Sequence, residues 1–270
     1  MILITGYKGF IGQNLVAKML ESRYTKNDLV LIDLKDGDVF KSLENVDFRN
    51  INKIVHLGAI SDTTETDVKK IMLYNVVFTL ELFKKAKEFQ IPIIYASSAS
   101  VYGNTTDFSY NPLNLYADSK MLVDTYVTSH IAEFLHIVGL RFFNVYGNME
   151  EHKKSQASPV TQFTLQAKGN GIIKVFEGSE NYKRDFVSVD DVIDCIFLSD
   201  EKESGIYDVG TSAQTSFLEV AYIIADRYHC NITEIEFPSK LKGKYQYSTI
   251  SRCHFDKKFF TINEWLELNR

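Results

Sequence analysis

The chain opens with the stretch Ile2–Gly12, ILITGYKGFIG, and this stretch decides the fold. Its apolar start is typical of a short strand buried on both faces, and apolar residues over 15–20 then recur at helical spacing. Between strand and helix stand Gly6, Gly9 and Gly12, each three positions after the last. Glycine permits a tight turn and lets the backbone approach a pyrophosphate, to which the helix N-terminus offers free N–H groups. The stretch therefore predicts a dinucleotide-binding turn.

An acidic residue stands where such a turn requires one. Asp33 follows the next apolar run, 29–32, and lies 21 positions beyond Gly12. There its carboxylate can accept hydrogen bonds from the hydroxyls of a dinucleotide's ribose. Its charge opposes a 2′-phosphate and favours NAD, whereas Lys35 lies close enough to counter that charge, so NAD and NADP both stay open. A plain strand–turn–helix unit with a loop aspartate is the alternative.

Strands and helices alternate through the first half of the chain. Apolar runs predict further strands at 53–57, 91–97 and 136–143, and helical spacing of apolar residues predicts helices at 71–89 and 122–134. Such alternation is typical of βαβ units. We therefore predict an α/β fold, a Rossmann-like doubly wound parallel sheet with helices on both faces.

The alternation ends after Asn144. Beyond it stand polar loops, predicted helices at 160–167 and 216–229, and short apolar runs at 174–176, 186–189 and 205–209. We expect residues 1–144 to form a dinucleotide-binding domain, which about 186–212 rejoin. Residues 145–185 and 213–270 are expected to form a smaller C-terminal α/β lobe that binds the substrate.

Composition narrows the class of protein. The 270 residues are 45% hydrophobic and 24% charged, as in a globular chain. The net charge of −5 offers no basic field for a nucleic-acid backbone, and no apolar run reaches the ~18 residues of a membrane span. The N-terminus lacks the features of a signal peptide, the three cysteines form no CxxC, and the six histidines form no metal cluster. We expect a cytoplasmic protein without nucleic-acid or membrane partners.

A second motif carries the chemistry. Tyr116 and Lys120 stand four positions apart and so share one face of a helix. A free phenol, with a pKa of about 10, is a poor base at neutral pH, but a nearby ammonium and an oxidised nicotinamide lower that pKa. The phenolate can then take a proton from a substrate hydroxyl as hydride leaves for the nicotinamide. Ser98 would hydrogen-bond the same oxygen, and Lys120 would also hold the cofactor ribose. A surface helix pair is the alternative.

Together these motifs resemble the extended short-chain dehydrogenase/reductases, and among them the nucleotide-sugar enzymes. Those enzymes carry, in the same order, segments that match Leu57-Gly58-Ala59, Asn75, Ser98–Gly103, Tyr116 with Lys120, Arg141–Gly147 and Arg184–Val192. The resemblance covers essentially the whole chain.

Longer strings in the second half resemble one family, the ADP-L-glycero-D-manno-heptose 6-epimerases. These strings are Glu151-His152-Lys153, Ser155–Ser158, Phe176–Phe186 and Phe237–Gln246. The resemblance implies an isomerase that inverts C6 of the heptose in ADP-D-glycero-β-D-manno-heptose. Hydride leaves C6 for a tightly bound NADP, or NAD, and returns to the other face of the ketone. The resemblance also implies a homo-oligomer, a pentamer, and a place in lipopolysaccharide biosynthesis.

The resemblance assigns a second proton-transfer group, because one base cannot serve both faces of the ketone. In this family a lysine does so, and it aligns with Lys153. A lysine in a loop beside the cofactor pocket can be desolvated enough to exchange protons. A solvated loop charge next to Lys154 is the alternative.

The resemblance also assigns the remaining site residues. At the cofactor it places Gly6, Gly9, Phe10, Ile11, Gly12, Asp33, Leu57, Gly58, Ala59, Asn75, Lys120 and Val145. At the substrate it places Asn144, Ser155, Phe176, Glu177, Gly178, Ser179, Arg184 and Tyr245. A guanidinium grips diphosphate oxygens bidentately, which suits Arg184, and a structural pair with Asp185 or a neighbour is the alternative. No residue is assigned to a metal.

The chain departs from the family at some positions, and other functions stay open. The family lysine that meets the 2′-phosphate of NADP aligns with Val39, and the segment between Asp33 and Lys53 is short, as if a strand–helix unit were trimmed.

A 4-epimerase shares the tyrosine and lysine but does not need Lys153. A cofactor-binding regulator without turnover is a further alternative, although such proteins usually lose one residue of the Tyr116/Lys120 pair.

Overall fold

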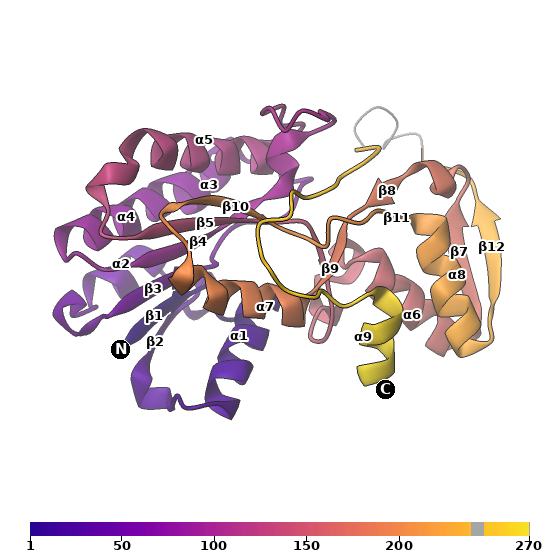
Figure 1. Ribbon diagram of the computed structural model, residues 1–270, viewed down its shortest axis with the longest axis horizontal. Helices are drawn as coiled ribbons and strands as arrows, with labels where there is room; N and C mark the ends of the chain where they lie inside the picture. Colours follow the sequence, from indigo (N-terminus) through magenta and orange to yellow (C-terminus); the bar gives the residue numbers. More distant parts are fainter. Residues whose placement is uncertain (239–245, 270) are drawn as a thin grey trace.

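The computed structural model describes residues 1–238 and 246–269, and its central feature is a six-stranded parallel sheet (Figure 1). The strands are β1 (Ile2–Thr5), β2 (Leu29–Ile32), β3 (Lys53–His56), β4 (Ile93–Ser98), β5 (Ile137–Phe142) and β10 (Gly205–Val209). They lie in the order β10-β5-β4-β3-β1-β2. The order reverses between β1 and β3, and parallel sheets bind their ligands at the carboxyl ends of strands beside such a reversal.

Helices cover both faces of this sheet. On one face α1 (Phe10–Glu21) and α7 (Val189–Leu198) share a core with the sheet. On the other face lie α2 (Val39–Glu44), the continuous helical stretch α3–η4–α4 and α5 (Leu115–His130), which share the second core. The stretch comprises α3 (Val68–Ile71), the π-helical η4 (Met72–Val77) and α4 (Phe78–Glu88). The predicted doubly wound α/β fold is confirmed.

The second half of the chain builds a third core beside the sheet (Figure 1). It holds α6 (Pro159–Asn170), α8 (Phe217–Tyr228) and α9 (Ile262–Leu268). Its strands pair two by two: β6 (Asn144–Tyr146) with β9 (Phe186–Ser188), β7 (Ile172–Phe176) with β12 (Asn231–Ile235), and β8 (Lys183–Arg184) with β11 (Thr215–Ser216). Residues 251–260 then return to the large sheet, where Lys257 pairs with Asp191 of α7. The domain boundaries stay a prediction.

Short 3-10 helices complete the described elements. They are η1 (Lys26–Asp28), η2 (Leu34–Asp36), η3 (Phe48–Asn50), η5 (Ala99–Tyr102), η6 (Ile131–Glu133), η7 (Glu151–Gln156), η8 (Ser179–Asn181) and η9 (Ser199–Glu201). Across the described ranges, no helix combines the length and the apolar character needed to cross a membrane.

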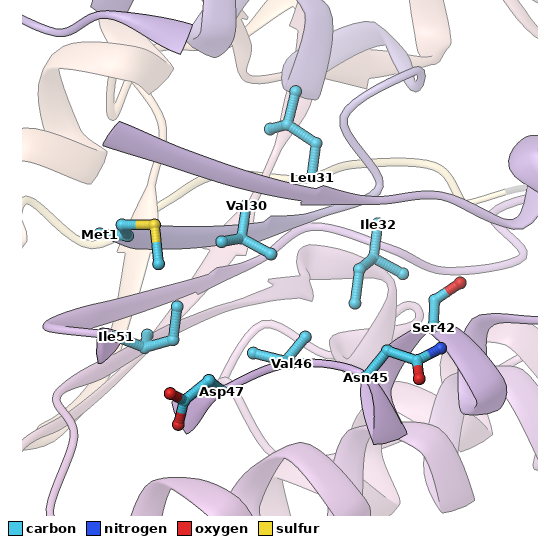
Figure 2. A pocket seen from close by; sticks show the side chains of 9 residues that line it. All are labelled: Met1, Val30, Leu31, Ile32, Ser42, Asn45, Val46, Asp47 and Ile51. Carbon is cyan, nitrogen blue, oxygen red and sulfur yellow. The ribbon is translucent and has the colours of Figure 1, made fainter. Parts of the chain in front are cut away.

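The short segment after β2 leaves that strand at the edge of the sheet. Between Asp33 and Lys53 the structure has only η2, the six-residue α2 and η3. A cavity of about 460 Å³ opens at this edge, lined by Met1, by β2 residues and by the chain from Ser42 to Ile51 (Figure 2). None of its lining residues is a predicted cofactor or substrate residue, so this cavity is separate from the candidate site.

Candidate functional site

The glycine turn lies at the carboxyl end of β1, where the strand order reverses. Gly6 has a φ of +74°, in the left-handed region that favours glycine, and its N–H donates to Ile32 O at 2.8 Å. Gly9 caps α1 without a side-chain acceptor. The first N–H groups of α1 therefore stay available to an anion such as a pyrophosphate.

Gly12 is the most crowded glycine of this turn. A Cβ there would lie 2.2 Å from Gly6 O and 2.7 Å from Tyr7 Cα, both backbone atoms. Replacing Gly12 by Ala is expected to displace the turn and to weaken dinucleotide binding by about 1–3 kcal/mol, the usual cost of overpacking. Calorimetric titration with NAD and NADP measures the loss.

Gly169→Ala is the matched control for Gly12→Ala. Gly169 lies near the end of α6, and an added Cβ would meet nothing within 4 Å. Dinucleotide affinity should stay at the wild-type value in this variant. Equal affinities of Gly12→Ala and Gly169→Ala would contradict the assignment of the turn.

Asp33 joins the glycine turn to the segment after β2. Its Oδ2 accepts from Lys8 N and its Oδ1 from Lys35 N, each at 2.9 Å. The lysine side chains lie close by, since the Lys8 ammonium pairs with Asp36 and Lys35 Nζ donates to Lys8 O at 3.3 Å. Carboxylate oxygens have further lone pairs, so Asp33 can still accept from a ribose hydroxyl.

His56, the last residue of β3, joins the end of β1 to α4. Thr79 Oγ1 donates its one proton to Asn75 O at 2.7 Å, so His56 Nε2 must be the donor in its 2.8 Å bond with Thr79. His56 Nδ1 then accepts from Thr5 Oγ1 at 2.6 Å. Burial, aided by the charge of Lys120, lowers the pKa of His56 to about 3, so the ring is neutral.

The side chain of Asn75 fixes the loop after β3 by hydrogen bonds to its backbone. Its Oδ1 accepts from Ile60 N at 2.7 Å, and its Nδ2 donates to Ile60 O and to Ser119 Oγ. Its side chain is buried within the π-helical stretch η4, a rare element often found at functional sites. The predicted cofactor residues Leu57, Gly58 and Ala59 are half-buried in this loop. The structure therefore gives Asn75 a role in fixing the loop.

Tyr116 and Lys120 share one face of α5, beside the end of β4. Lys120 Nζ lies 5.9 Å from the centre of the Tyr116 ring and donates to Ala96 O at 2.7 Å. Ser98 ends β4, and its Oγ accepts from Ser100 N. Burial lowers the pKa of Lys120 to about 8, against the opposing charge of Asp124.

The protein groups shift the pKa of Tyr116 in the direction opposite to our expectation. Burial above all raises that pKa, the hydrogen bond with Ser98 lowers it, and the charge of Asp124 adds to the rise. The reason is that the phenol is desolvated while the Lys120 ammonium is held by the Ala96 carbonyl. The lowering expected from the sequence must therefore come from an added positive charge, which an oxidised nicotinamide would supply.

The depressed pKa of Lys120 makes a prediction for stability. Below about pH 8 the ammonium is charged in both states and its burial costs free energy, whereas between about pH 8 and 10.5 only the unfolded state keeps the proton. The free energy of unfolding should therefore rise with pH across this window, by up to about 3 kcal/mol. Urea unfolding at both ends of the window measures it, and Lys120→Met should lack this rise. The same rise in Lys120→Met would show that other groups cause it.

A buried network of hydrogen bonds lies on the side of α5 that faces the sheet. The carboxylate of Asp124, one turn after Lys120, accepts from Ser97 Oγ at 2.9 Å and from Arg141 Nε at 2.7 Å. Arg141 donates onward to Tyr102, whose hydroxyl donates to Asp208 at 2.6 Å. The network ties α5 to β4, β5 and β10. Sequence analysis missed Asp124, although its spacing of four from Lys120 placed it on the same helical face.

Lys153 lies beside the start of α1. It belongs to η7, its Nζ is 5.3 Å from the centre of the Phe10 ring, and it pairs with Glu150 at 3.1 Å. Asn14 of α1 donates to Asn148 O at 2.8 Å and so ties this loop to the helix of the glycine turn. The structure thus brings Lys153 and the predicted cofactor residue Phe10 together.

The predicted substrate residues lie along the second half of the chain. Asn144 and Val145 are in β6, Phe176 ends β7, Glu177 and Gly178 follow it, Ser179 begins η8, and the backbone of Ser155 lies in η7. Arg184 is buried, donates to Lys183 O and to Gln246 O at 2.9 and 2.5 Å, and lies 5.3 Å from the Phe217 ring centre. Tyr245 lies outside the described residues.

Asp185, the alternative partner of Arg184, has other contacts. Its carboxylate accepts from Thr211, Ser212 and Ser251, at 2.6 to 3.0 Å. In the part of the chain that the structure describes, no three His, Cys, Asp or Glu side chains gather as a metal site would require.

Comparisons with known proteins point to one family. The profile of the NAD dependent epimerase/dehydratase family matches residues 2–210. The solved ADP-L-glycero-D-manno-heptose-6-epimerase of Helicobacter pylori is 30% identical, with a TM-score of 0.82 over 98% of this chain and 93% of that one. The UDP-N-acetylglucosamine 4-epimerase of Methanobrevibacter ruminantium is 19% identical, with a TM-score of 0.83 over 98% and 96%. The UDP-glucose 4-epimerase of Thermus thermophilus, solved with NAD, is 20% identical, with a TM-score of 0.76 over 98% and 97%.

Proposed function

The chain belongs to the NAD-dependent epimerase/dehydratase family, and we propose that it is the epimerase that inverts C6 of ADP-D-glycero-β-D-manno-heptose. One observation carries this proposal: Lys153, a second proton-transfer candidate besides Tyr116, lies 5.3 Å from the Phe10 ring at the start of the helix that follows the glycine turn. An enzyme that reduces a ketone from both faces needs a proton-transfer group for each face. The 30% identity to a heptose 6-epimerase supports the same substrate.

The residues present fit a dinucleotide. A Cβ at Gly6 or Gly12 would lie 2.5 or 2.2 Å from backbone atoms, so glycine is what allows the tight turn that such a cofactor needs. The N-terminus of α1 has no side-chain cap, and Asp33 can accept from a ribose hydroxyl. The bound dinucleotide would accept hydride from C6 and return it. The chain's own groups do the rest: Lys120 and Asp33 hold the ribose hydroxyls, and Ser98 orients the reacting oxygen.

Two side chains, Tyr116 and Lys153, each carry out one of the two proton transfers. Tyr116, as phenolate, takes the hydroxyl proton while hydride leaves C6, and becomes the neutral phenol. After the ketone turns over, the Lys153 ammonium gives a proton to the same oxygen while hydride returns, and becomes the neutral amine. A proton passes from Tyr116 to solvent and from solvent to Lys153 before the next turnover, so charge and protons balance. In the reverse reaction the two groups exchange roles.

For the cofactor we propose that the pocket accepts NADP as well as NAD. Two ammonium groups, those of Lys8 and Lys35, lie beside Asp33. They can replace the family lysine that meets the 2′-phosphate, whose place Val39 takes in this chain. Asp36 neutralises one of them by its pair with Lys8. Asp36→Asn should therefore raise the ratio of NADP to NAD affinity in calorimetric titrations, and Lys8→Ala should lower it. An unchanged ratio in both variants would refute this part of the proposal.

The test of the function uses the purified protein and ADP-D-glycero-β-D-manno-heptose, with the C6 epimer ratio followed by NMR. We expect both epimers to reach the same final mixture whichever is supplied. Lys153→Met should lose inversion by roughly 10²–10⁴-fold, while the neighbouring Lys154→Met, an exposed lysine of the same turn, should retain it. Absence of conversion by a folded wild-type protein with either dinucleotide would refute the heptose assignment. Full activity of Lys153→Met would favour a mechanism of the 4-epimerase kind.

A further inference from the structure

Glu150 is a buried carboxylate that the reaction outlined above does not use. Its side chain is 0% exposed, and it lies three residues before Lys153, whose side chain is 29% exposed. Burial strengthens the interaction between the Glu150 carboxylate and the half-buried Lys153 ammonium. The pair also lies beside the predicted cofactor turn, so Glu150 is a candidate for a role in the function of Lys153 as well as in the fold.

Both oxygens of Glu150 are fully engaged. Oε1 accepts from Lys153 Nζ at 3.1 Å and from Ser158 N at 2.8 Å. Oε2 accepts from Ser158 Oγ at 2.7 Å and from Thr161 Oγ1 at 2.6 Å. Since Ser158 caps α6, the carboxylate joins the Lys153 turn to the start of that helix.

The turn that carries Lys153 needs such a support. Met149 and Lys154, on either side of it, have φ values of +66° and +51°, in the left-handed region that residues with side chains rarely adopt. Strained backbone of this kind persists only where the surroundings hold it in place, and it often occurs at functional sites. Glu150 lies between these two residues, and its four contacts fix the turn from one side.

We propose that Glu150 is the positioning residue of Lys153: it holds the Lys153 ammonium beside Phe10, at the start of the helix that follows the glycine turn. This proposal rests on the proposed function for the role of Lys153, but its charge effect can be measured without any substrate. Loss of the Glu150 charge should free the Lys153 side chain from this place and expose its amine to small reagents, because an amide oxygen holds an ammonium more weakly than a carboxylate does.

Glu150→Gln removes the charge and can keep every contact. The amide oxygen, placed at Oε1, still accepts from Ser158 N and Lys153 Nζ. The amide NH₂, placed at Oε2, donates to the hydroxyls of Ser158 and Thr161, which can rotate to accept. Glu151→Gln is the matched control, because Glu151 is the exposed neighbour of the same turn.

The first readout is the rate of amine labelling at one fixed pH. Wild type, Glu150→Gln and Glu151→Gln are treated with trace acetic anhydride, and mass spectrometry gives the labelling rate of Lys153 relative to that of its exposed neighbour Lys154. We expect this ratio to rise roughly two- to fivefold in Glu150→Gln and to keep its wild-type value in Glu151→Gln. An unchanged ratio in folded Glu150→Gln would overturn the proposal. A Glu150→Gln protein that does not fold would overturn it as well, because it would show that the carboxylate serves structure alone.

The second readout separates position from stability. Thr161→Val removes one hydroxyl from Glu150 but leaves both charges, so it should lower the unfolding temperature while the labelling ratio of Lys153 stays at the wild-type value. On the epimerase substrate, Glu150→Gln should lower kcat with a smaller change in KM. If the wild type shows no epimerase activity but the change in labelling is present, the proposed function fails while the coupling of Glu150 to Lys153 stands.

Discussion

Replacing Tyr116 by Phe is expected to lower kcat for C6 inversion by roughly 10²–10⁴-fold, the usual contribution of a positioned acid–base group. The variant loses one hydroxyl, and with it the group that takes the substrate proton as hydride leaves. Its ring, its place on α5 and the Lys120 ammonium 5.9 Å from its centre should remain. Dinucleotide binding should therefore persist. Initial rates by NMR, together with calorimetric titration of the dinucleotide, measure both quantities.

Tyr126→Phe is the control on the same helix. The Tyr126 hydroxyl accepts from Lys87 Nζ at 3.0 Å on the far part of α5, so its loss should leave kcat within a few-fold of the wild type. Comparable rates for Tyr116→Phe and Tyr126→Phe would remove Tyr116 from the chemistry.

Replacing Arg141 by Met is expected to cost about 3–5 kcal/mol of the free energy of unfolding. The guanidinium, whose side chain is 7% exposed, faces the fully buried Asp124 carboxylate at 2.7 Å. Its removal leaves a buried charge whose remaining side-chain partners in the described part of the chain are two hydroxyls, Tyr95 at 2.9 Å and Ser97 at 2.9 Å. Urea unfolding followed by circular dichroism gives the change.

Two further variants decide whether the unpaired charge is the cause. Asp124→Asn combined with Arg141→Met should regain part of the lost stability, because the buried charge is then absent. Lys258→Met breaks a pair with Glu264 in which the lysine side chain is 83% exposed, so its effect should be far smaller. Equal losses for Arg141→Met and Lys258→Met would contradict the role given to the buried network.

Local patterns predicted most of the elements that build the dinucleotide site. The three glycines within residues 2–12 correctly placed the turn between a strand and a helix. The apolar run 29–32 correctly placed Asp33 directly after a strand. The predicted helix at 122–134 was wrong at both ends, since α5 spans Leu115–His130. Its start is set by Asn114, whose side chain accepts from Ala117 N at 2.9 Å. An Asn before a helix is a recognised cap, so this signal was present in the sequence.

Contacts between distant residues could not be predicted in this way. Asp124 meets residues of β4 and β5, and the sign of the pKa shift of Tyr116 follows from burial that only the packed structure creates. Glu150 lies close in sequence to its partners, but nothing in that stretch indicated that its side chain would be fully buried. The π-helical stretch around Asn75 likewise interrupts what the sequence predicted as one regular helix.

The most direct test of the account follows hydrogen at C6 of the heptose. ADP-D-glycero-β-D-manno-heptose carrying deuterium at C6 is incubated with the protein in ordinary water, and NMR reports both the configuration and the isotope at C6. The account predicts inverted product that keeps its deuterium, because hydride leaves for a bound dinucleotide and returns without exchange with solvent. Inverted product that has lost its deuterium would contradict the transient oxidation, and recovery of the substrate without inversion would contradict the assigned reaction.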